Sequence, residues 1–423
     1  MVSLSYLLDA PNLLVYCMNH LHLGIIREGK MPADSRVPFT PLQCRTLSDQ
    51  YPQLRISVAP SDVRCFSDDE YRACGIELTA DLSNCDVLMG VKEVPKEQLL
   101  PNKRYFFFSH TIKQQTYNRS LLQAIVRKGI EMLDYECLVD ERETRILGFG
   151  RFAGIVGAHN GLLMYGQKTG AFSLPPAYEC HDYAAIKAIY ATLQLPPMRI
   201  VLTGTGRVSR GAKEVLDVLE IPELSPAEYL RNEALPYAVY TQLRSSDLYR
   251  REKDGNLDYY DRLDFHHHPE LYRCDFEAYT RITDLMLNGV FWHPQAPRFF
   301  SKADMRRPDF RIRAIADISC DINGSIPATT RATTIGDAVM GYNPHTEQEE
   351  APYQAHTIDI MSVDNLPNEL PRDASDMFGS ALSQWVVPEL FKPESPLLQR
   401  ATICKNGVLC PRFAYLSHFL AGK

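Results

Sequence analysis

Several side chains that can exchange protons near neutral pH stand where short apolar runs end. They are Lys92 and Glu93 in DVLMGVKE, His110 in RYFFFSH, Glu136 in IEMLDYE, and Asp317 and Asp321 in RIRAIADISCD. Taken singly, a polar residue at such a position is more often a solvated strand end than a catalytic group. Taken together, a lysine, a histidine and several acids can shift one another's pKa values toward neutrality. We therefore interpret the set as a candidate acid–base cluster.

Two arginines in loop-like segments are candidates for binding a carboxylate. Arg36 stands in DSRVPFTP and Arg145 in ETRILGFG. The planar guanidinium can hold both oxygens of a carboxylate at once. An ordinary surface charge is the alternative for each. As a pair, the two arginines suit a substrate that carries several carboxylates better than a monocarboxylate.

A glycine-rich turn lies between the apolar run MRIVLTG and the helical pattern AKEVLDVL. The turn carries Gly204, Gly206, Ser209 and Gly211. In a dinucleotide-binding fold, glycines here let the backbone approach a pyrophosphate, and the N-terminus of the next helix supplies amide donors. Ser209 replaces the third glycine of the usual fingerprint, and a tight connection without a ligand is the alternative. The order of strand, turn and helix favours nucleotide binding.

The segment after this helix bears on the choice of cofactor. NAD-binding folds place an acid at the end of the next strand, where it binds a ribose 2′-hydroxyl. Here the region reads IPELSP, with Ser225 near the expected place. A missing carboxylate favours NADP(H), because a carboxylate would repel a 2′-phosphate, while NAD(H) stays open. Arg207, in the turn itself, is the nearest candidate cation for a phosphate.

The elements that must position these residues alternate along the chain. From residue 22 to about 135, short strand-like runs alternate with helical patterns. The later elements are expected as a helical stretch at 151–195, a strand from 198, strands at 311–319 and 357–367, and a helix at 374–391. Residues 226–310 are aromatic and irregular, which indicates an elaborated insertion. Strands that alternate with helices predict an α/β fold with parallel sheets covered on both faces.

Length and composition exclude several classes of protein. The chain has 423 residues, 45% hydrophobic and 23% charged, which is typical of two or three globular domains. Its net charge is −7 at pH 7 and its pI is about 6.0, so it offers no global positive field for nucleic acid or an anionic membrane. Eleven cysteines without a C-x-x-C pair indicate reduced thiols and a cytoplasmic protein. His266 to His268 lack partners at metal-ligand spacing, so we expect no metal site.

Residues 1–20 are apolar but do not have the pattern of a targeting segment. No Lys or Arg precedes Arg27, and Asp9 and Pro11 interrupt the run. A secretory signal needs a basic start, and a spanning helix needs about 20 apolar residues. We expect a non-core extension that stems from a start site assigned too early, since Met18 stands just before the first convincing strand.

Five ordered runs resemble one enzyme family. FFSHTIKQQ, GFGRFAGIVG, LTGTGRVSRGA, IADISCDINGSI and SVDNLP are similar to the lysine-ketoglutarate reductase domain and to the lysine-forming saccharopine dehydrogenases. These belong to the wider alanine dehydrogenase and transhydrogenase superfamily. The resemblance covers roughly residues 22–392. It implies an NAD(P)-dependent oxidoreductase that condenses L-lysine with 2-oxoglutarate and reduces the imine to saccharopine, or catalyses the reverse reaction.

The resemblance also implies roles for individual residues. Lys92 and His110 match the acid–base pair of the family. The positions that match residues near the substrate are Arg36, Glu93, Gln115, Glu136, Arg145, Phe149, Ser319, Cys320 and Asp321. On the nucleotide side, the matching positions are Gly206 and Arg207 in the turn, together with Phe291, Ile318, Val363, Asp364, Asn365 and Leu366.

The family's architecture predicts two Rossmann-like, doubly wound parallel-sheet domains with a cleft between them. We expect residues 21–148 plus 369–423 to form a substrate domain of the alanine dehydrogenase N-terminal type, and residues 149–368 to form the dinucleotide-binding domain. The expected partners are an amino acid and an oxo acid, without nucleic acid or membrane, in a monomer or small homo-oligomer.

Two other functions stay open at this stage. An alanine dehydrogenase-like enzyme, or another amino-acid or opine dehydrogenase, would keep the fold and the hydride transfer but change the substrate. A catalytically inactive nucleotide-binding regulatory protein would keep only the cofactor site. The presence of the candidate acid–base pair and of both arginines favours an enzyme.

Overall fold

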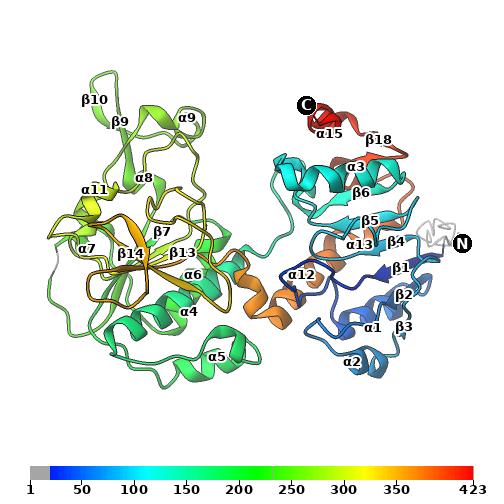
Figure 1. Cartoon of the computed structure of the whole chain (residues 1–423), viewed down its shortest axis with the longest axis horizontal. Coiled ribbons are helices and arrows are strands. Elements are labelled where there is room, and N and C mark those ends of the chain that lie inside the picture. The colour runs from blue at the N-terminus through cyan, green and yellow to red at the C-terminus, as the bar shows by residue number, and fades with distance from the viewer. Residues whose placement is uncertain (1–19, 232, 423) are drawn as a thin grey trace, which may run out of the picture. The chain divides into compact units, whose positions relative to one another are not determined.

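The computed structural model describes residues 20–231 and 233–422 of the chain (Figure 1). The chain divides into two compact units, which we describe separately. Unit 1 consists of Met1–Leu147 and Gly379–Lys423, and unit 2 of Gly148–Phe378. Apart from His20, the predicted non-core extension lies outside the described residues.

Unit 1 contains an eight-stranded sheet in the order β18-β17-β6-β5-β4-β1-β2-β3. The strands are β1 (Leu21–Ile25), β2 (Leu54–Val58), β3 (Glu77–Leu78), β4 (Val87–Met89), β5 (Arg104–Phe107), β6 (Glu131–Asp134), β17 (Thr402–Lys405) and β18 (Val408–Leu409). Strands β1 to β6 run parallel, whereas β17 pairs antiparallel to β6 and to β18. The last segment of the chain therefore completes a sheet that the first segment begins.

Three helices of unit 1 connect these parallel strands. They are α1 (Pro41–Gln50), α2 (Asp68–Ala73) and α3 (Arg119–Arg127). Thr40 and Ser67 begin α1 and α2 with reciprocal capping boxes, which satisfy amide groups that a helix N-terminus leaves without partners. Each helix returns the chain to the end of the sheet where the previous strand began. The carboxyl ends of the parallel strands therefore lie at one end of the sheet.

Unit 2 contains a seven-stranded sheet in the order β15-β14-β16-β13-β12-β7-β8. The strands are β7 (Arg199–Thr203), β8 (Val239–Leu243), β12 (Leu285–Asn288), β13 (Ala314–Asp317), β14 (Val339–Asn343), β15 (Gln348–Glu350) and β16 (Ile358–Met361). Helices α4 (Gly150–Thr169) and α6 (Arg207–Val218) pack against each other, and α4 also contacts β12 and β13. Both units thus have the predicted α/β architecture.

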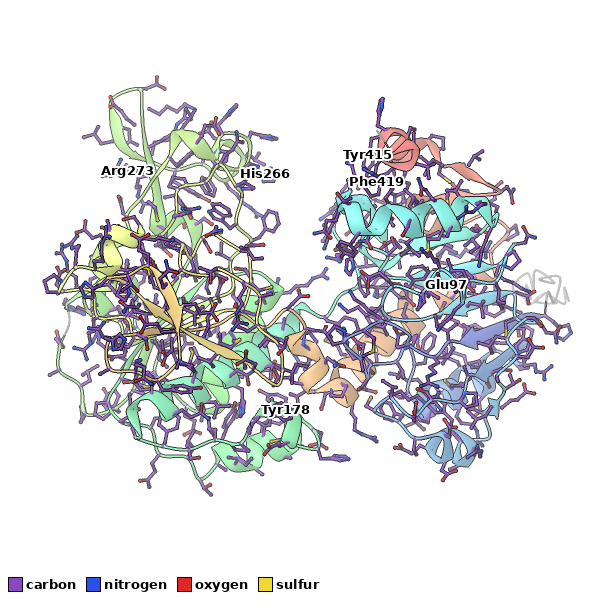
Figure 2. The ribbon with its side chains drawn as sticks, viewed as in Figure 1. Glu97, Tyr178, His266, Arg273, Tyr415 and Phe419 are labelled. Atoms are coloured by element: carbon purple, nitrogen blue, oxygen red, sulfur yellow. The ribbon has the colours of Figure 1, made fainter. Side chains whose placement is uncertain are left out.

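The prediction that residues 226–310 are irregular is wrong in part. Strands β8 and β12 lie in this stretch and flank β7 on its two sides. The rest of the stretch includes a small antiparallel sheet of β9 (Tyr249–Lys253), β10 (Asn256–Tyr259) and β11 (Arg273–Cys274), beside helix α9 (Arg262–His267) (Figures 1 and 2). The aromatic residues of this added sheet hid the periodicity of the two core strands.

The described part of the chain contains no helix with the length and apolarity needed to cross a membrane.

Candidate active site

Glu93 and His110 form a hydrogen-bonded pair in unit 1, after β4 and β5. His110 Nδ1 lies 2.6 Å from Glu93 Oε1, and Lys30 Nζ lies 2.7 Å from Glu93 Oε2. Burial alone would raise the pKa of Glu93, but the hydrogen bond with His110 and the ion pair with Lys30 outweigh it and lower the pKa to about 2. Glu93 is therefore a carboxylate at neutral pH. It accepts the Nδ1 proton, which leaves Nε2 of a neutral imidazole free to accept another.

Lys92 is the second candidate acid–base residue and neighbours Glu93 in the chain. Burial lowers the pKa of Lys92, the nearby Arg36 lowers it further, and Asp34 acts in the opposite direction. A lysine with a lowered pKa can both accept and release a proton closer to neutral pH than an exposed lysine. The sequence could not reveal this effect, because Lys30, Asp34 and Arg36 come from a coil that follows β1.

Arg36 is already held by a carboxylate of its own chain. Its Nε and Nη2 donate to Asp34 Oδ1 at 2.9 Å and Oδ2 at 2.6 Å, and both side chains are buried. The pair is bidentate, which fixes the plane of the guanidinium. A role of Arg36 in binding a substrate carboxylate stays a prediction, and such a substrate would meet an arginine that Asp34 orients.

Glu136 and Arg145 are brought together in the same unit. Arg145 Nη2 donates to Glu136 Oε1 at 2.8 Å, and Lys113 Nζ lies 3.5 Å from the same oxygen. The Arg145 guanidinium also lies over the ring of Phe108 at 5.8 Å, and Phe108 stacks with His110 at a centroid distance of 6.3 Å. Phe108 therefore links the arginine to the histidine. Sequence reasoning missed Lys113, although it stands three residues after His110.

Gln115 and Phe149 are two further residues that the resemblance assigns to the substrate. Gln115 is exposed, and its side chain makes no hydrogen bond with another described residue. Phe149 belongs to unit 2, where it precedes α4 and stacks on Phe378 at 4.5 Å. Their assignment to the substrate stays a prediction.

Two candidate residues adopt left-handed backbone conformations. His110 has φ 53° and Cys320 has φ 48°. Non-glycine residues rarely adopt this conformation, and those that do are concentrated at functional sites. Asp134 supports the conformation after β5, because its Oδ2 accepts the Ser109 amide at 2.9 Å and its Oδ1 accepts the Glu136 amide at 2.7 Å. The ends of β5 and β6 are thus tied together beside His110.

In unit 2, the glycine-rich turn joins β7 to α6 as predicted. Gly204 has φ 87°, a conformation that favours glycine. Gly206 precedes the first residue of α6, and a Cβ built at this position would meet nothing within 4 Å. This open space before the helix N-terminus fits the pyrophosphate of a dinucleotide, whose negative charge the amide groups would stabilise.

Ser209 and Gly211, two of the predicted cofactor-binding residues, serve packing in this structure. Ser209 is buried, and its hydroxyl donates to Thr203 O at 3.0 Å and Gly289 O at 3.1 Å. A Cβ at Gly211 would lie 2.0 Å from Arg151 O, so only glycine allows α6 to approach α4. Their contribution to a nucleotide site would come through the shape of the turn.

Asp317, predicted as part of the acid–base cluster, lies in unit 2, in a buried polar network at the ends of β7, β12 and β13. The sequence analysis missed the network's other members Thr203, Asn288 and Thr329. Thr203 donates to Asn288 Oδ1 at 2.7 Å, and Asn288 Nδ2 donates to Asp317 Oδ1 at 2.8 Å. Asp317 also accepts from Ser319 and Thr329, at 2.8 and 2.6 Å, and its burial raises its pKa. Asn288 ends an apolar run, LMLN, and could have been found by the rule that selected the other strand-end residues.

This network positions the predicted residues that follow β13. Ile318 is buried against Gly157 of α4, and its amide donates to Asn288 O at 3.0 Å. Cys320 Sγ lies 3.9 Å from Asp364 Oδ1, and burial raises the pKa of Cys320 to about 12. Three kinds of position remain among the predicted residues here. Val363 and Leu366 are buried, and Asn365 is half-buried. Asp321 directly follows Cys320, and Phe291 is 88% exposed.

Ser225 does not lie at the end of the next strand, contrary to prediction. Its side chain begins α7 (Pro226–Leu230) with a capping box to Glu228. The strand that pairs with β7 is β8, and it ends beside the glycine turn: Gly204 N donates to Leu243 O at 2.8 Å. The residue that follows β8 is Arg244, which is exposed. The expectation failed because β8 lies in the stretch that the sequence pattern left irregular.

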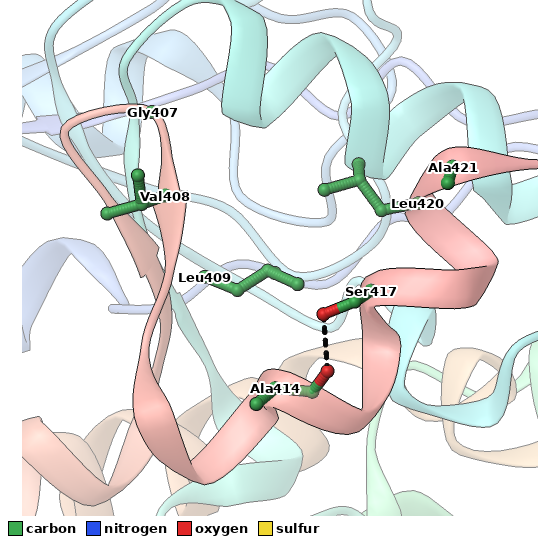
Figure 3. Close-up of a pocket in the computed structure, with 7 residues that line it drawn as sticks. All are labelled: Gly407, Val408, Leu409, Ala414, Ser417, Leu420 and Ala421. Carbon is green, nitrogen blue, oxygen red and sulfur yellow. Dashed lines mark hydrogen bonds between the residues drawn. The ribbon is translucent and has the colours of Figure 1, made fainter.

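Two other features lie apart from the predicted site residues. A hollow of about 530 Å³ in the C-terminal part of unit 1 is lined mostly by apolar residues between Gly407 and Ala421, and none of the predicted site residues lines it (Figure 3). Among the described residues, no three His, Cys, Asp or Glu side chains gather as metal ligands. His266 lies on α9, beside the added sheet (Figure 2).

The comparisons with known proteins agree with this arrangement. Residues 24–156 match the family model described as alanine dehydrogenase/PNT, N-terminal domain. This part of the chain is therefore similar to an alanine dehydrogenase/PNT N-terminal domain. It contains Lys92, His110 and both candidate arginines. A solved L-alanine dehydrogenase superposes with a TM-score of 0.64 at 14% identity and covers 95% of this chain and 99% of its own, which shows the same fold.

The alanine dehydrogenase/PNT domain continues into a longer similarity. The chain is 31% identical over 437 residues to the alpha-aminoadipic semialdehyde synthase of Arabidopsis thaliana, covering 93% of this chain. It spans about two fifths of that synthase, 41% of its length. It is 24% identical over 377 residues to the saccharopine dehydrogenase (NAD(+), L-lysine-forming) of Emericella nidulans, covering 84% of this chain and 89% of that enzyme. The chain is a homologue of both enzymes.

Proposed function

We propose that the chain is a nicotinamide-dependent oxidoreductase acting on a C–N bond, which condenses L-lysine with 2-oxoglutarate to saccharopine or catalyses the reverse. The observation that carries the proposal is the cluster of Lys92, Glu93 and His110. It lies in a chain homologous to an alpha-aminoadipic semialdehyde synthase and to a lysine-forming saccharopine dehydrogenase. The arginines Arg36 and Arg145 support a substrate with several carboxylates.

The residues of the cluster suit the proton transfers of this reaction. The lysine ε-amine must be neutral to attack the keto carbon, the carbinolamine must lose water, and the amine product must gain a proton. Lys92, with its lowered pKa, and His110, held by Glu93, can supply one acid and one base near neutral pH. When bound, the nicotinamide cofactor supplies the hydride that reduces the imine carbon.

For the cofactor we propose NADP(H) in preference to NAD(H). The support is the end of β8, where Gln242, Leu243 and Arg244 bring a cation and no carboxylate to the neighbourhood of the glycine turn. The first acid, Asp247, accepts the Arg244 amide at 2.7 Å. A cation at this position would attract a 2′-phosphate. Arg244→Ala should lower the affinity for adenosine 2′,5′-bisphosphate about tenfold but leave AMP binding unchanged, as measured by calorimetry. Equal losses for both nucleotides would contradict the preference.

The activity itself is tested by cofactor oxidation. Purified enzyme with NADPH or NADH, L-lysine and 2-oxoglutarate should form saccharopine, detected by mass spectrometry. Each substrate is omitted in turn as a control. No turnover with either cofactor between pH 6 and 10 would reject the proposal.

A second candidate is an amino-acid dehydrogenase that acts on a monocarboxylate, as an alanine dehydrogenase does. It is favoured by the alanine dehydrogenase fold and by the pairing of Arg36 with Asp34, which already occupies one arginine. A screen that varies the amino acid and the oxo acid independently separates the two. Retained activity of Arg36→Ala on a small amino acid alone would favour the second candidate.

The compartment and assembly remain part of the proposal. We propose a cytoplasmic monomer or small homo-oligomer whose partners are its small-molecule substrates. Free thiols support a reducing compartment, since none of the ten cysteines in the described residues is in a disulfide.

A further inference from the structure

The carboxylate of Glu28, which the sequence analysis did not single out, binds the main chain at Val91 and Lys92. Glu28 follows β1, and its two oxygens accept two successive amides after β4: Oε1 from Val91 N at 2.5 Å and Oε2 from Lys92 N at 2.9 Å. The two strands are neighbours in the sheet, and Glu28 is more than 60 residues away in the chain. A carboxylate that takes both amides fixes the peptide unit between them in position and in plane.

The local backbone is shaped for this contact. Gly90 lies between the end of β4 and Val91, and a Cβ at Gly90 would lie 3.1 Å from Glu28 Oε1 and 2.6 Å from Ile26 Cδ1. The Gly90 amide itself donates to Phe106 O at 2.9 Å, on β5. The turn that leads to Lys92 is therefore held from β5 on one side and by Glu28 on the other, and glycine leaves room for the carboxylate.

The same group of charges acts on Glu28 and on Lys92. Burial and Asp34 raise the pKa of Glu28 to about 8, although the two amide hydrogen bonds and Arg36 lower it, so the carboxylate that accepts both amides is fully formed only above pH 8. Glu28 also acts on the buried hydroxyl of Tyr135. Arg36 and Asp34 are likewise the charges with the largest effect on Lys92. Glu28 therefore lies within the electrostatic surroundings of the candidate acid–base residue.

We propose that Glu28 is a positioning residue for Lys92: its carboxylate holds the Val91–Lys92 peptide so that the lysine amine stays at its buried place in the cluster. The inference rests on the proposed function for the catalytic role of Lys92. Glu28 does not touch the reacting atoms. Its effect passes through the main chain.

The isosteric variant Glu28→Gln tests the two hydrogen bonds that Glu28 accepts from Val91 N and Lys92 N. An amide side chain keeps one acceptor oxygen and places an N–H₂ donor against the second amide, so one of the two contacts is lost. We expect kcat at pH 9, where Glu28 is ionised, to fall about 10- to 100-fold, the range for a small misplacement of a reacting group. The KM values for both substrates should change less than about threefold, because no substrate-binding side chain is altered. Glu97→Gln is the control, since Glu97 is an exposed carboxylate of the same unit whose nearest cation, Lys96, is 4.0 Å away (Figure 2).

A second readout does not depend on turnover. The pKa of Lys92 is measured from the pH dependence of its acetylation by acetic anhydride, followed by peptide mass spectrometry. In Glu28→Gln the amine should leave its buried place, so its pKa should rise toward the ordinary value. A role limited to stability would lower the melting temperature but leave kcat per folded enzyme and the Lys92 pKa unchanged, and that result would overturn the inference.

Two further outcomes are informative. If Glu28→Gln does not fold, Glu28→Asp, which keeps the charge but shortens the reach by one methylene, is measured in the same way. If Lys92→Met keeps full activity, the catalytic role of Lys92 is wrong, whereas the acetylation of Lys92 still decides whether Glu28 positions it.

Discussion

At the scale of single residues, the cluster in unit 1 shows how a carboxylate organises a candidate acid–base site. Glu93 accepts from His110 and pairs with Lys30, and these two contacts keep it ionised despite its burial. The negative charge would stabilise a protonated imidazole, and the hydrogen bond fixes the ring nitrogen that faces away from Glu93. In the proposed mechanism, Glu93 orients His110 and keeps its own charge, and His110 would exchange the proton.

Loss of either candidate acid–base group should reduce the rate strongly. Lys92→Met and His110→Gln should each lower kcat about 100-fold or more, because a positioned acid or base contributes at least that much. The matched control is Lys96→Met, which removes an exposed lysine four residues after Lys92. Steady-state kinetics on protein of unchanged circular dichroism gives the answer. Full activity in both variants would reject the assigned roles.

The open space at Gly206 makes a second prediction. Gly206→Ala should leave the melting temperature unchanged, because the added methyl group meets no atom within 4 Å and φ is −73°. It should weaken dinucleotide binding about tenfold or more, because the methyl group would occupy the place of the pyrophosphate. Gly336→Ala is the control, since its Cβ also meets nothing within 4 Å. Equal affinity of the wild type and Gly206→Ala for the cofactor would argue against a pyrophosphate at this turn.

At the scale of elements, the packing of α4 on α6 depends on two glycines, one in each helix. Each lies against the backbone of the opposite helix. A Cβ at Gly154 of α4 would lie 1.9 Å from Val208 O, and one at Gly211 of α6 would lie 2.0 Å from Arg151 O. The two helices can therefore approach to backbone contact. The first residues of α6 carry the candidate phosphate-binding amides, so this packing sets where the turn stands relative to the sheet.

A buried acid beside the middle of α4 predicts a pH-dependent stability. Glu369 lies in the short helix η6 (Leu366–Glu369), where burial raises its pKa from 4.5 to about 7. Among the described residues, only the Asn160 side chain donates to its carboxyl group, at 2.8 Å. An acid with a raised pKa in the folded state binds more protons folded than unfolded between about pH 4.5 and 7, so stability falls as the pH rises through this window. Above pH 7 the cost is about 3 kcal/mol.

Replacing this acid by its amide should therefore stabilise the protein at alkaline pH. Glu369→Gln keeps an acceptor for Asn160 and should raise the free energy of unfolding by about 3 kcal/mol at pH 8, with the difference vanishing near pH 4.5. Urea unfolding at pH 5 and pH 8 measures it. Glu252→Gln, at an exposed position of β9, should show no such difference. A constant gap between Glu369→Gln and wild type across this range would show that Glu369 is not buried as an acid.

The sequence predicted elements well where an apolar run ends in a charged residue. The runs that became β4, β5 and β6 are short, buried and followed by Lys92, His110 and Glu136. It failed for β8 and β12, because the aromatic insertion between them has no regular period. It also missed Glu28, because a residue in a coil after β1 shows no pattern until the fold brings it to β4.

At the scale of the whole molecule, the net charge of −7 requires that anionic ligands be met by local cations. Two candidate cations are present, and each already forms an ion pair with an acid of the same chain, Arg36 with Asp34 and Arg145 with Glu136. If Arg36 and Arg145 bind the substrate as proposed, an anionic substrate would join an existing ion pair or displace its acid. Such paired cations are oriented before binding, which lowers the entropic cost of ordering them.

The C-terminal segment should be required for unit 1 and dispensable for unit 2. Ile403 and Cys404 of β17 are fully buried against β6. Deleting residues 402–423 should expose the β6 edge and abolish hydrogen-exchange protection in β5 and β6, while β7 and β12 stay protected. Exchange measured by mass spectrometry on the full chain and the deletion variant tests this. Unchanged protection of β6 would show that β17 is not integral to the sheet.

The pairing of β17 with β6 also sets the order in which the nascent protein can fold. Cys404 lies against Ile130 O, 274 residues earlier in the chain. At about 5 to 20 residues per second, a ribosome needs roughly 14 to 55 s to make that stretch. Unit 2 is continuous and can fold as it emerges, whereas the first sheet waits with its β6 edge unpaired. During translation, the unit whose synthesis begins first is therefore finished last and depends longest on protection from aggregation.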